Sequence, residues 1–415
     1  MPSRFSTRLL PHERPVYPLD CRNAGDAGRS MKIAFYALTV SLFLAVCFFL
    51  LGKNVERLMN RVVPVDLPVV SDRARTLHAS SFVVDLHSDT SLTGRPILDR
   101  SKVGHVDWPR MEEGGVGLQF FTAPTKVPIS LDIHRTDANA PDVLSLLDFA
   151  KHGPFYKASP YRRGMLQGEQ VRHAVELSEG ALVLIRTRRD LEALIDGRAN
   201  NSRAIGALLG LEGAHALQSK VKYLERFYDA GVRMIGLTHF FDNDFAGSAH
   251  GVERGGLTDL GRDLVRRLID YGIMIDLAHL SPAAIDDVLA MVDVPTVVSH
   301  TGVKGTCDNP RNLSDEHIRA IANGGGVIGI GYFELAVCGT APKDIVAAML
   351  HVVGLVGDDH VALGSDYDGA VTVAFDTSQL QVLTQTMIDA ELSDESIRKI
   401  LGGNIVRVMR EVLPD

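Results

Sequence analysis

Eight short apolar runs alternate with longer stretches of helical period from residue 78 to the C-terminus. The runs are rich in Val, Ile and Leu, as in strands that are buried on both faces of a parallel sheet. Eight such strands, each followed by a helix, close into a barrel. The sequence therefore predicts an α/β fold, a (β/α)8 TIM-type barrel over residues 78–415. The predicted strands cover residues 82–87, 116–121, 204–212, 232–239, 273–279, 295–300, 326–332 and 361–366.

The stretches between the runs carry helix start and stop signals. In residues 257–272, Thr258 or Asp259 can cap the start of a helix, and Gly272 can end it. A ninth apolar run, residues 181–186, exceeds the number that a barrel needs. We assign it to the long insertion between the second and third strands.

Six of the eight predicted strands end in His, Asp or Glu. The C-terminal ends of the strands of a (β/α)8 barrel surround one mouth, so residues far apart in the sequence converge there. We therefore expect a single polar site. The residues at these strand ends are His87 with Asp89, Glu212, His239, His279, His300 and Asp366.

Imidazole and carboxylate groups at these positions suit zinc. His87 and Asp89 lie two apart on an extended segment, so their side chains share one side and can hold one ion. His279 and His300 can hold a second ion, and Glu212 can bridge the two. The sequence predicts a site for two Zn2+ ions, of the metal-dependent hydrolase kind.

Two neighbouring zinc ions that share a water molecule lower its pKa and polarise a carbonyl oxygen, which favours amide hydrolysis. Asp366 can then carry the proton from this bridging water to the leaving amine. His239 can donate a hydrogen bond to the oxyanion of the tetrahedral intermediate. Each residue alone is more often structural, and only their coincidence at successive strand ends favours a site.

Several polar residues near these strand ends are left outside the site. Asp368 is interpreted as a turn residue, and His215 and His250 as residues behind the site or on the surface. Asp242, Asn243 and Asp244 either line a substrate pocket or shape a loop.

The N-terminus predicts a membrane anchor. Residues 33–51 form an uncharged apolar run long enough to span a bilayer as one helix, although a cleaved signal peptide is the alternative. Basic residues are more frequent before this run than directly after it, which places residues 1–32 in the cytoplasm. Residues 52–77, which contain Pro64 and Pro68, are expected to form a linker. The catalytic domain would then be extracytoplasmic, and periplasmic in a Gram-negative cell.

Charge and cysteine content narrow the function further. The net charge of −8 provides no basic surface for neutralising phosphates, so no nucleic-acid partner is expected. Cys307 and Cys338 are the two cysteines outside the leader and the anchor. They could form a disulfide in an oxidising compartment or remain buried thiols.

Several blocks of residues 78–412 resemble, in order, the blocks of the membrane dipeptidase family, the zinc metallopeptidases that are similar to renal dipeptidase. Residues 122–203 match that family poorly, so preference for substrate side chains stays open. The blocks are HVDWPRMEEGGVGLQFF (105–121), LEGAHAL (211–217), GVRMIGLTHFFDNDFAGSA (231–249), LTDLGRDLVRRL (257–268), IDLAHLS (275–281), SHTGVKGTCDNPRNLSDE (299–316), LGSDYDG (363–369) and GGNIVRVM (402–409).

The resemblance implies specific roles. One zinc ion would be held by the residues matching His87, Asp89 and Glu212, and the other by those matching Glu212, His279 and His300. His239 matches a histidine that binds substrate and stabilises the intermediate, and Asp366 the catalytic aspartate. Arg311 matches an arginine that binds the C-terminal carboxylate of a dipeptide.

Other implications of the resemblance concern assembly. Cys307 and Cys338 lie near positions that are disulfide-linked in animal relatives, and the family suggests a homodimer. The animal enzymes resemble secreted precursors with a lipid anchor at the other end, whereas this chain has an N-terminal apolar run.

Three functions are therefore weighed. The first is zinc-dependent hydrolysis of dipeptides. The second is a related binuclear amidohydrolase that acts on N-acyl amino acids, lactams or other small amides. The third is a membrane-tethered binding domain without turnover, which is disfavoured because all five ligands and Asp366 are present.

Overall fold

The computed structural model describes residues 33, 35–36, 39, 56–152 and 158–415. The chain divides into two compact units, Met1–Gly52 and Lys53–Asp415. The predicted membrane helix, residues 33–51, lies almost entirely outside the described residues. Among the residues that the structure does describe, no helix combines the length and the apolar character needed to cross a membrane.

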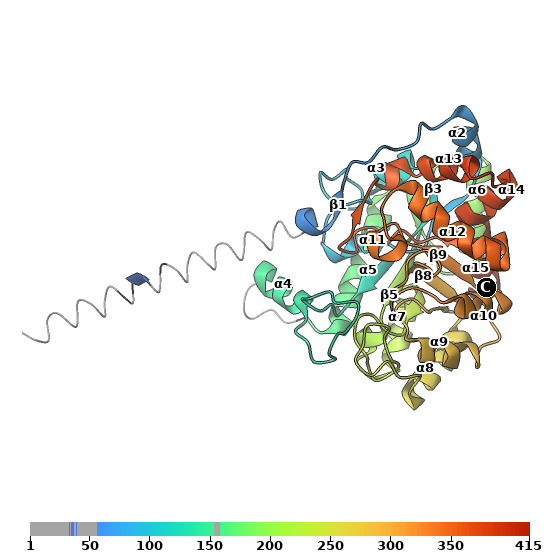
Figure 1. The fold of residues 1–415 in the computed structure, drawn as a ribbon. Coiled ribbons are helices and arrows are strands. Elements are labelled where there is room, and N and C mark those ends of the chain that lie inside the picture. Colours follow the sequence, from blue (N-terminus) through green and yellow to red (C-terminus); the bar gives the residue numbers. More distant parts are fainter. Residues whose placement is uncertain (1–32, 34, 37–38, 40–55, 153–157) are drawn as a thin grey trace, which may run out of the picture. The chain divides into compact units, whose positions relative to one another are not determined.

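Eight parallel strands form a closed barrel in the second unit (Figure 1). Their order around the ring is β3-β2-β10-β9-β8-β7-β6-β5, and pairing of β3 with β5 closes it. Each of the eight predicted runs overlaps one of these strands, so the predicted (β/α)8 barrel is confirmed. The strands are β2 (Val83–Asp85), β3 (Val116–Pro124), β5 (Ile205–Glu212), β6 (Val232–Gly236), β7 (Met274–Asp276), β8 (Val297–Thr301), β9 (Val327–Ile330) and β10 (Val361–Leu363).

The ninth apolar run also forms a strand, β4 (Leu182–Leu184). It pairs in parallel with Ile205–Ala207, the first residues of β5. Further along β5, residues Leu209–Leu211 pair with β6 instead. The strand therefore extends the sheet at one end of β5 and lies outside the closed ring.

Helices surround the barrel. The prediction for residues 257–272 is confirmed by α8 (Asp259–Tyr271), in which the Thr258 side chain accepts a hydrogen bond from Gly261 N and Gly272 takes a left-handed φ of 63°. The other helices are α2 (Asp72–Ala79), α3 (Trp108–Glu113), α4 (Val143–His152), α5 (Pro160–Leu177), α6 (Arg188–Ala199), α7 (Tyr223–Asp229), α9 (Pro282–Leu289), α10 (Asp315–Asn323), α11 (Glu334–Val337), α12 (Pro342–Val356), α13 (Gln381–Asp389), α14 (Asp394–Arg398) and α15 (Asn404–Val412).

Two apolar clusters form the core. The larger one lies between the sheet and the helices that cover it. The smaller one takes one or two residues from each barrel strand and is joined by Ile405, Val408 and Met409 of α15. Because these side chains alternate along the strands with those that face the helices, the barrel interior is filled with apolar side chains. The polar site is therefore confined to the mouth.

Residues 56–77, predicted as part of a linker, differ from that prediction. The strand β1 (Arg61–Val62) pairs with β11 (Thr372–Val373), and the side chain of Asn60 bonds Asp368 O and Ala370 N. These contacts provide hydrogen-bond partners for backbone groups of the segment after β10. The segment is thus an integral part of the second unit.

Candidate metal centre and substrate pocket

The polar residues predicted to share one site are brought together at the C-terminal ends of the strands. Glu212 ends β5 and His300 lies within β8, but His239, His279 and Asp366 follow the last ladder residues of β6, β7 and β10. The predicted strands were therefore too long at these ends. His279 and Asp366 have φ angles of 65° and 61°, and this left-handed conformation turns the chain out of the strand.

Glu212 lies at the centre of the group. Its Oε1 is 3.5 Å from Nε2 of His87, 3.0 Å from Nε2 of His279 and 3.5 Å from Nε2 of His300. The Nε2 atom of His87 is also 3.4 Å from Oδ1 of Asp89. Two ligands about 2.1 Å from a tetrahedral zinc ion are about 3.4 Å apart. The spacing of these donors therefore fits metal ligation.

Among the five candidate ligands, two buried side-chain atoms have no hydrogen-bond partner in the described part of the chain, Nε2 of His87 and Oε2 of Glu212. Leaving buried polar groups unpaired is costly, and such groups are usually satisfied by a partner. In a cluster of nitrogen and carboxylate donors, metal ions would satisfy both atoms. The residues present therefore fit zinc or a similar cation.

Ser299 fixes the orientation of two of the imidazoles. Its hydroxyl donates to Oδ2 of Asp276 at 2.6 Å, and its oxygen lies 3.1 Å from Nδ1 of His87 and 3.0 Å from Nδ1 of His300. Because the hydroxyl proton is given to Asp276, the oxygen accepts from both Nδ1–H groups. In the neutral form of each ring, Nε2 is then without a proton and faces Glu212.

His250 fixes the orientation of the imidazole of His279. Its Nδ1 lies 3.1 Å from the carbonyl oxygen of Ile133, which can only accept, so Nδ1 carries the proton. The Nε2 atom of His250 then accepts from Nδ1–H of His279 across 2.9 Å. The proton-free Nε2 of His279 lies 3.0 Å from Nε2 of His300. The lone pairs of two proton-free nitrogens at this distance repel each other. They therefore require a cation or a proton between or beside them.

The electrostatics of the site also favour cations. Burial raises the pKa of Glu212 well above its ordinary value, and the nearby Asp89 raises it further. Burial lowers the pKa of His87, but Glu212 and Asp89 outweigh it and raise the value to about 10. A cluster of buried carboxylates thus attracts positive charge, and a metal ion would compete with these protons.

Asp366 and His239 complete the rim of the centre. The Oδ1 atom of Asp366 is 3.8 Å from Nε2 of His87, and burial raises the pKa of Asp366 to about 8. Burial lowers the pKa of His239 well below 6.5, so its ring is neutral, and its Nδ1 has no partner among the described residues. The Nε2 atom of His239 is 3.5 Å from Oε1 of Glu212, so distance alone also admits His239 as a metal ligand.

Arg311 lies buried at the side of the centre. Its Nη2 donates to His300 O at 2.7 Å and its Nη1 donates to Thr301 Oγ1 at 3.3 Å. Burial lowers the pKa of Arg311, while the carboxylates of Asp366 and Glu212 raise it. The guanidinium therefore lies in the pocket with both a fixed position and neighbouring acids.

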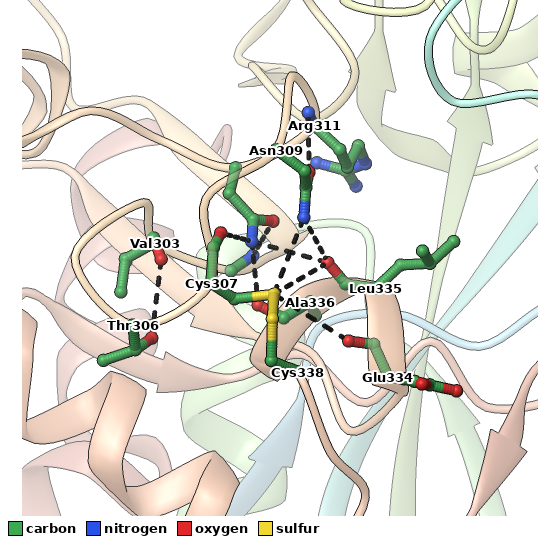
Figure 2. Close-up of a disulfide and its surroundings, with 11 residues drawn as sticks. Val303, Thr306, Cys307, Asn309, Arg311, Glu334, Leu335, Ala336 and Cys338 are labelled. Carbon is green, nitrogen blue, oxygen red and sulfur yellow. Dashed lines mark hydrogen bonds between the residues drawn. A yellow bond between two sulfur atoms is a disulfide. The ribbon is translucent and has the colours of Figure 1, made fainter.

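A disulfide joins Cys307 to Cys338 beneath the loop that carries Arg311 (Figure 2). Asn309 strengthens this connection, because its Nδ2 donates to Leu335 O at 2.8 Å and its Oδ1 accepts from Arg311 N at 2.9 Å. The bridge thus ties the loop after β8 to α11, which follows β9. Its effect is to hold the backbone of Arg311.

Reasoning from the sequence missed several residues that support the centre. Ser299 and Asp276 were not singled out, although Asp276 ends a strand in the same way as the chosen acids. For His250 the first of the two alternatives holds, because it lies behind the site and contacts the candidate ligand His279. Asp368, interpreted as a turn residue, is buried and accepts from Nη2 of Arg95 at 2.6 Å.

One pocket opens above the centre. Its base contains Asp89, Glu212, His239, His279, His300, Arg311 and Asp366. Its walls come from residues 124–147, which start at the last residue of β3, from Phe333 and Leu335 after β9, and from Met59 near the N-terminal end of the second unit. The pocket is therefore polar at the base and largely apolar along the walls, as in many small-molecule sites.

A (β/α)8 barrel with buried imidazoles and carboxylates at its C-terminal mouth defines a metal-dependent hydrolase. The comparisons with known proteins make the class specific. The family described as Membrane dipeptidase (Peptidase family M19) matches residues 71–413, and the chain belongs to this family.

The curated relatives and the solved structures are consistent with this assignment. The chain is 29% identical to dipeptidase verJ of Clonostachys rogersoniana over 319 residues, which are 75% of this chain and 76% of the relative. It is 27% identical to dipeptidase tcpJ of Claviceps purpurea over 318 residues, 74% of this chain and 69% of the relative.

The fold is shared with solved structures of low sequence identity. The probable dipeptidase PvdM from Pseudomonas aeruginosa is 21% identical with a TM-score of 0.69, covering 82% of this chain and 98% of that one. A metallopeptidase from Rhodobacter sphaeroides, solved with a phosphinate mimic of the dipeptide L-Ala-D-Ala, is 22% identical with a TM-score of 0.65, covering 80% and 100%.

Proposed function

We propose that this protein hydrolyses dipeptides and holds two zinc ions, one by His87, Asp89 and Glu212 and the other by Glu212, His279 and His300. The observation that carries the proposal is the central position of Glu212 Oε1, within 3.5 Å of the Nε2 atoms of all three histidines. When bound, the two ions supply an activated water and polarise the carbonyl of the scissile amide.

Asp366 is proposed to move the proton. The carboxyl lies at the pocket base, and burial raises its pKa to about 8, so it can both accept and release a proton near neutral pH. A neighbouring cation would lower this pKa again. Asp366 takes a proton from the attacking water and delivers it to the amine that leaves when the C–N bond breaks.

His239 and Arg311 are proposed to bind the substrate. A neutral His239 with a free ring nitrogen can donate a hydrogen bond to the oxyanion that forms on the carbonyl. The Arg311 guanidinium can pair with a free carboxylate through charge-assisted hydrogen bonds. Because Arg311 has a fixed position, this pair forms only when the C-terminal carboxylate lies at one distance from the scissile bond. This requirement favours dipeptides over longer peptides.

Membrane attachment and location are part of the same proposal. The apolar run 33–51 supports a single-pass anchor with residues 1–32 in the cytoplasm. The disulfide between Cys307 and Cys338 supports an extracytoplasmic catalytic unit, because disulfides persist in oxidising compartments. Family resemblance is the support for a homodimer.

The test uses the full-length chain in detergent. We expect two zinc ions per chain, and hydrolysis of L-Ala-L-Ala that stops on chelation and returns with zinc. N-acetyl-L-alanine and a β-lactam serve as the amidohydrolase comparison. Preferential turnover of either compound would favour the amidohydrolase function over dipeptide hydrolysis. One zinc ion per chain would contradict the proposed two-metal centre.

A further inference from the structure

The pocket has two unlike ends that lie on opposite sides of the barrel mouth. In the ring order β3-β2-β10-β9-β8-β7-β6-β5, three strands separate β3 from β8 in either direction. Arg311 follows β8, and the wall formed by residues 124–147 follows β3. A substrate that spans the mouth therefore has one end at Arg311 and the other at this wall.

The wall after β3 is apolar. Every pocket-lining residue that the structure describes between 124 and 147 is Pro, Val, Leu or Ile. The exposure of these side chains varies along the wall: Ile129 is 55% exposed, whereas Leu144 is 5% exposed. Apolar side chains gathered at the edge of a pocket mark a surface that a ligand covers.

This wall is held in place before any ligand binds. Arg163 of α5 donates to Asp142 Oδ2 at 2.6 Å, to Asp148 Oδ2 at 2.9 Å and to Thr125 O at 3.0 Å. An antiparallel bridge pairs Pro128 with Asp142. Arg163 thus holds Thr125, near the start of this segment, to Asp142 and Asp148 near its end, and the apolar side chains form a fixed surface.

From this arrangement we propose that the preferred substrates are dipeptides whose N-terminal residue has a large apolar side chain. The inference rests on the proposed function, in which Arg311 holds the C-terminal carboxylate and the scissile bond lies over the metal centre. The N-terminal residue then points toward the β3 side of the mouth, and its side chain packs on Ile129, Ile133 and Leu147. A charged side chain there would lose its hydration without gaining a partner.

The test compares kcat/KM for L-Leu-L-Ala, L-Asp-L-Ala, L-Lys-L-Ala and L-Ala-L-Leu with that for L-Ala-L-Ala, using the full-length protein loaded with zinc. We expect L-Leu-L-Ala to exceed the Asp and Lys peptides by about 10- to 100-fold, in the range that apolar pockets achieve. We also expect L-Leu-L-Ala to exceed L-Ala-L-Leu. Equal values for the Leu, Asp and Lys peptides, or a preference that follows the C-terminal residue, would overturn the inference.

A pair of variants on one helix isolates the wall. Leu147 lines the pocket, whereas Leu146 of the same helix does not and is 42% exposed. Leu147→Asp should lower the ratio of L-Leu-L-Ala to L-Ala-L-Ala hydrolysis about tenfold, and Leu146→Asp should leave it unchanged. Equal ratios in both variants and the wild type would contradict the inference.

The outcome also separates this inference from the proposed function. If L-Ala-L-Ala is hydrolysed without any apolar preference, the proposed function stands and the wall has another role. If none of the dipeptides is hydrolysed by zinc-loaded protein, the proposed function itself fails.

Discussion

The hydroxyl of Ser299 donates to Oδ2 of Asp276 across 2.6 Å, and this bond determines what the serine oxygen can do for the metal centre. Ser299 precedes the candidate ligand His300, and Asp276 ends the neighbouring strand β7. Since the single hydroxyl proton is engaged, the oxygen is left to accept from two imidazoles. One serine thus supports a ligand of each proposed ion, His87 and His300.

Ser299→Ala should weaken zinc binding about 10- to 100-fold, the usual cost of removing a group that orients metal ligands. The reason is that both Nδ1–H groups lose their acceptor. Zinc affinity measured by competition with a chromogenic chelator tests this, and Ser299→Thr, which keeps a hydroxyl, is the control. Wild-type affinity in Ser299→Ala would show that the imidazoles do not depend on the serine.

Asp366→Asn should reduce kcat about 10²- to 10⁴-fold, because an amide cannot transfer the proton that the proposed mechanism requires. Metal content should stay at the wild-type value, since Asp366 is not a proposed ligand. Steady-state kinetics and metal analysis of the same preparation test the two parts. Turnover close to wild type would exclude Asp366 as the proton carrier.

Arg311→Ala should lower kcat/KM for L-Ala-L-Ala by on the order of 10- to 100-fold through a higher KM, because charge-assisted hydrogen bonds to the carboxylate are lost. The matched substrate is the C-terminal amide of the same dipeptide, which lacks the carboxylate. We expect the variant to hydrolyse acid and amide with similar efficiency. A variant that still strongly prefers the free acid would contradict the assignment.

Replacing both Cys307 and Cys338 by Ser should lower the free energy of unfolding by about 3–4 kcal/mol, the chain-entropy value for a cross-link over 31 residues. It should also raise KM, since the bridge holds the loop that carries Arg311. Urea unfolding and dipeptide kinetics measure the two effects. If reductant destabilises this double variant as much as it destabilises the wild type, the assignment of the stability to this bridge is wrong.

His78 should make the fold sensitive to acid. Its Nδ1 lies 2.8 Å from Thr384 Oγ1 and its Nε2 lies 2.8 Å from Gly114 O, and burial lowers its pKa below 6.5. Below pH 6.5 the unfolded chain binds a proton that the folded chain does not, so the free energy of unfolding falls as the pH decreases. The slope for one group is at most about 1.4 kcal/mol per pH unit.

The variant His78→Gln keeps a donor and an acceptor but cannot be protonated. Its free energy of unfolding should fall less steeply than that of the wild type between pH 7 and pH 5. Urea titrations of both proteins across this range test the difference. Parallel curves would mean that His78 does not contribute to the pH dependence.

The sequence was sufficient for the barrel because each strand and helix leaves a local signal. Alternation of buried apolar runs with amphipathic stretches is set by backbone period, and the cap residues around 257–272 are local as well. It was also sufficient to place the candidate ligands near one another, since Glu212 and His300 occur at strand ends and strand ends of a barrel share one mouth.

The ends of the strands and the segment before the barrel were less predictable. His279 and Asp366 continue an apolar run in the sequence, but their left-handed φ angles are imposed by the turn that aims their side chains. Residues 61–62 pair with residues 372–373, and no pattern in either short segment specifies the other. Charged residues and two prolines suggested a linker there.

What the sequence by itself determined is the position of the barrel strands along the chain and the kinds of donor at their ends. What only the tertiary structure decided is which nitrogen of each imidazole carries no proton and which side chains surround the substrate. His87 and Ser299 are 212 residues apart, and the hydrogen bond between them exists only after the ring has closed. The local periodicity of the sequence determines the helices and strands. Which nitrogen of an imidazole carries the proton depends on hydrogen-bond partners that only folding brings together.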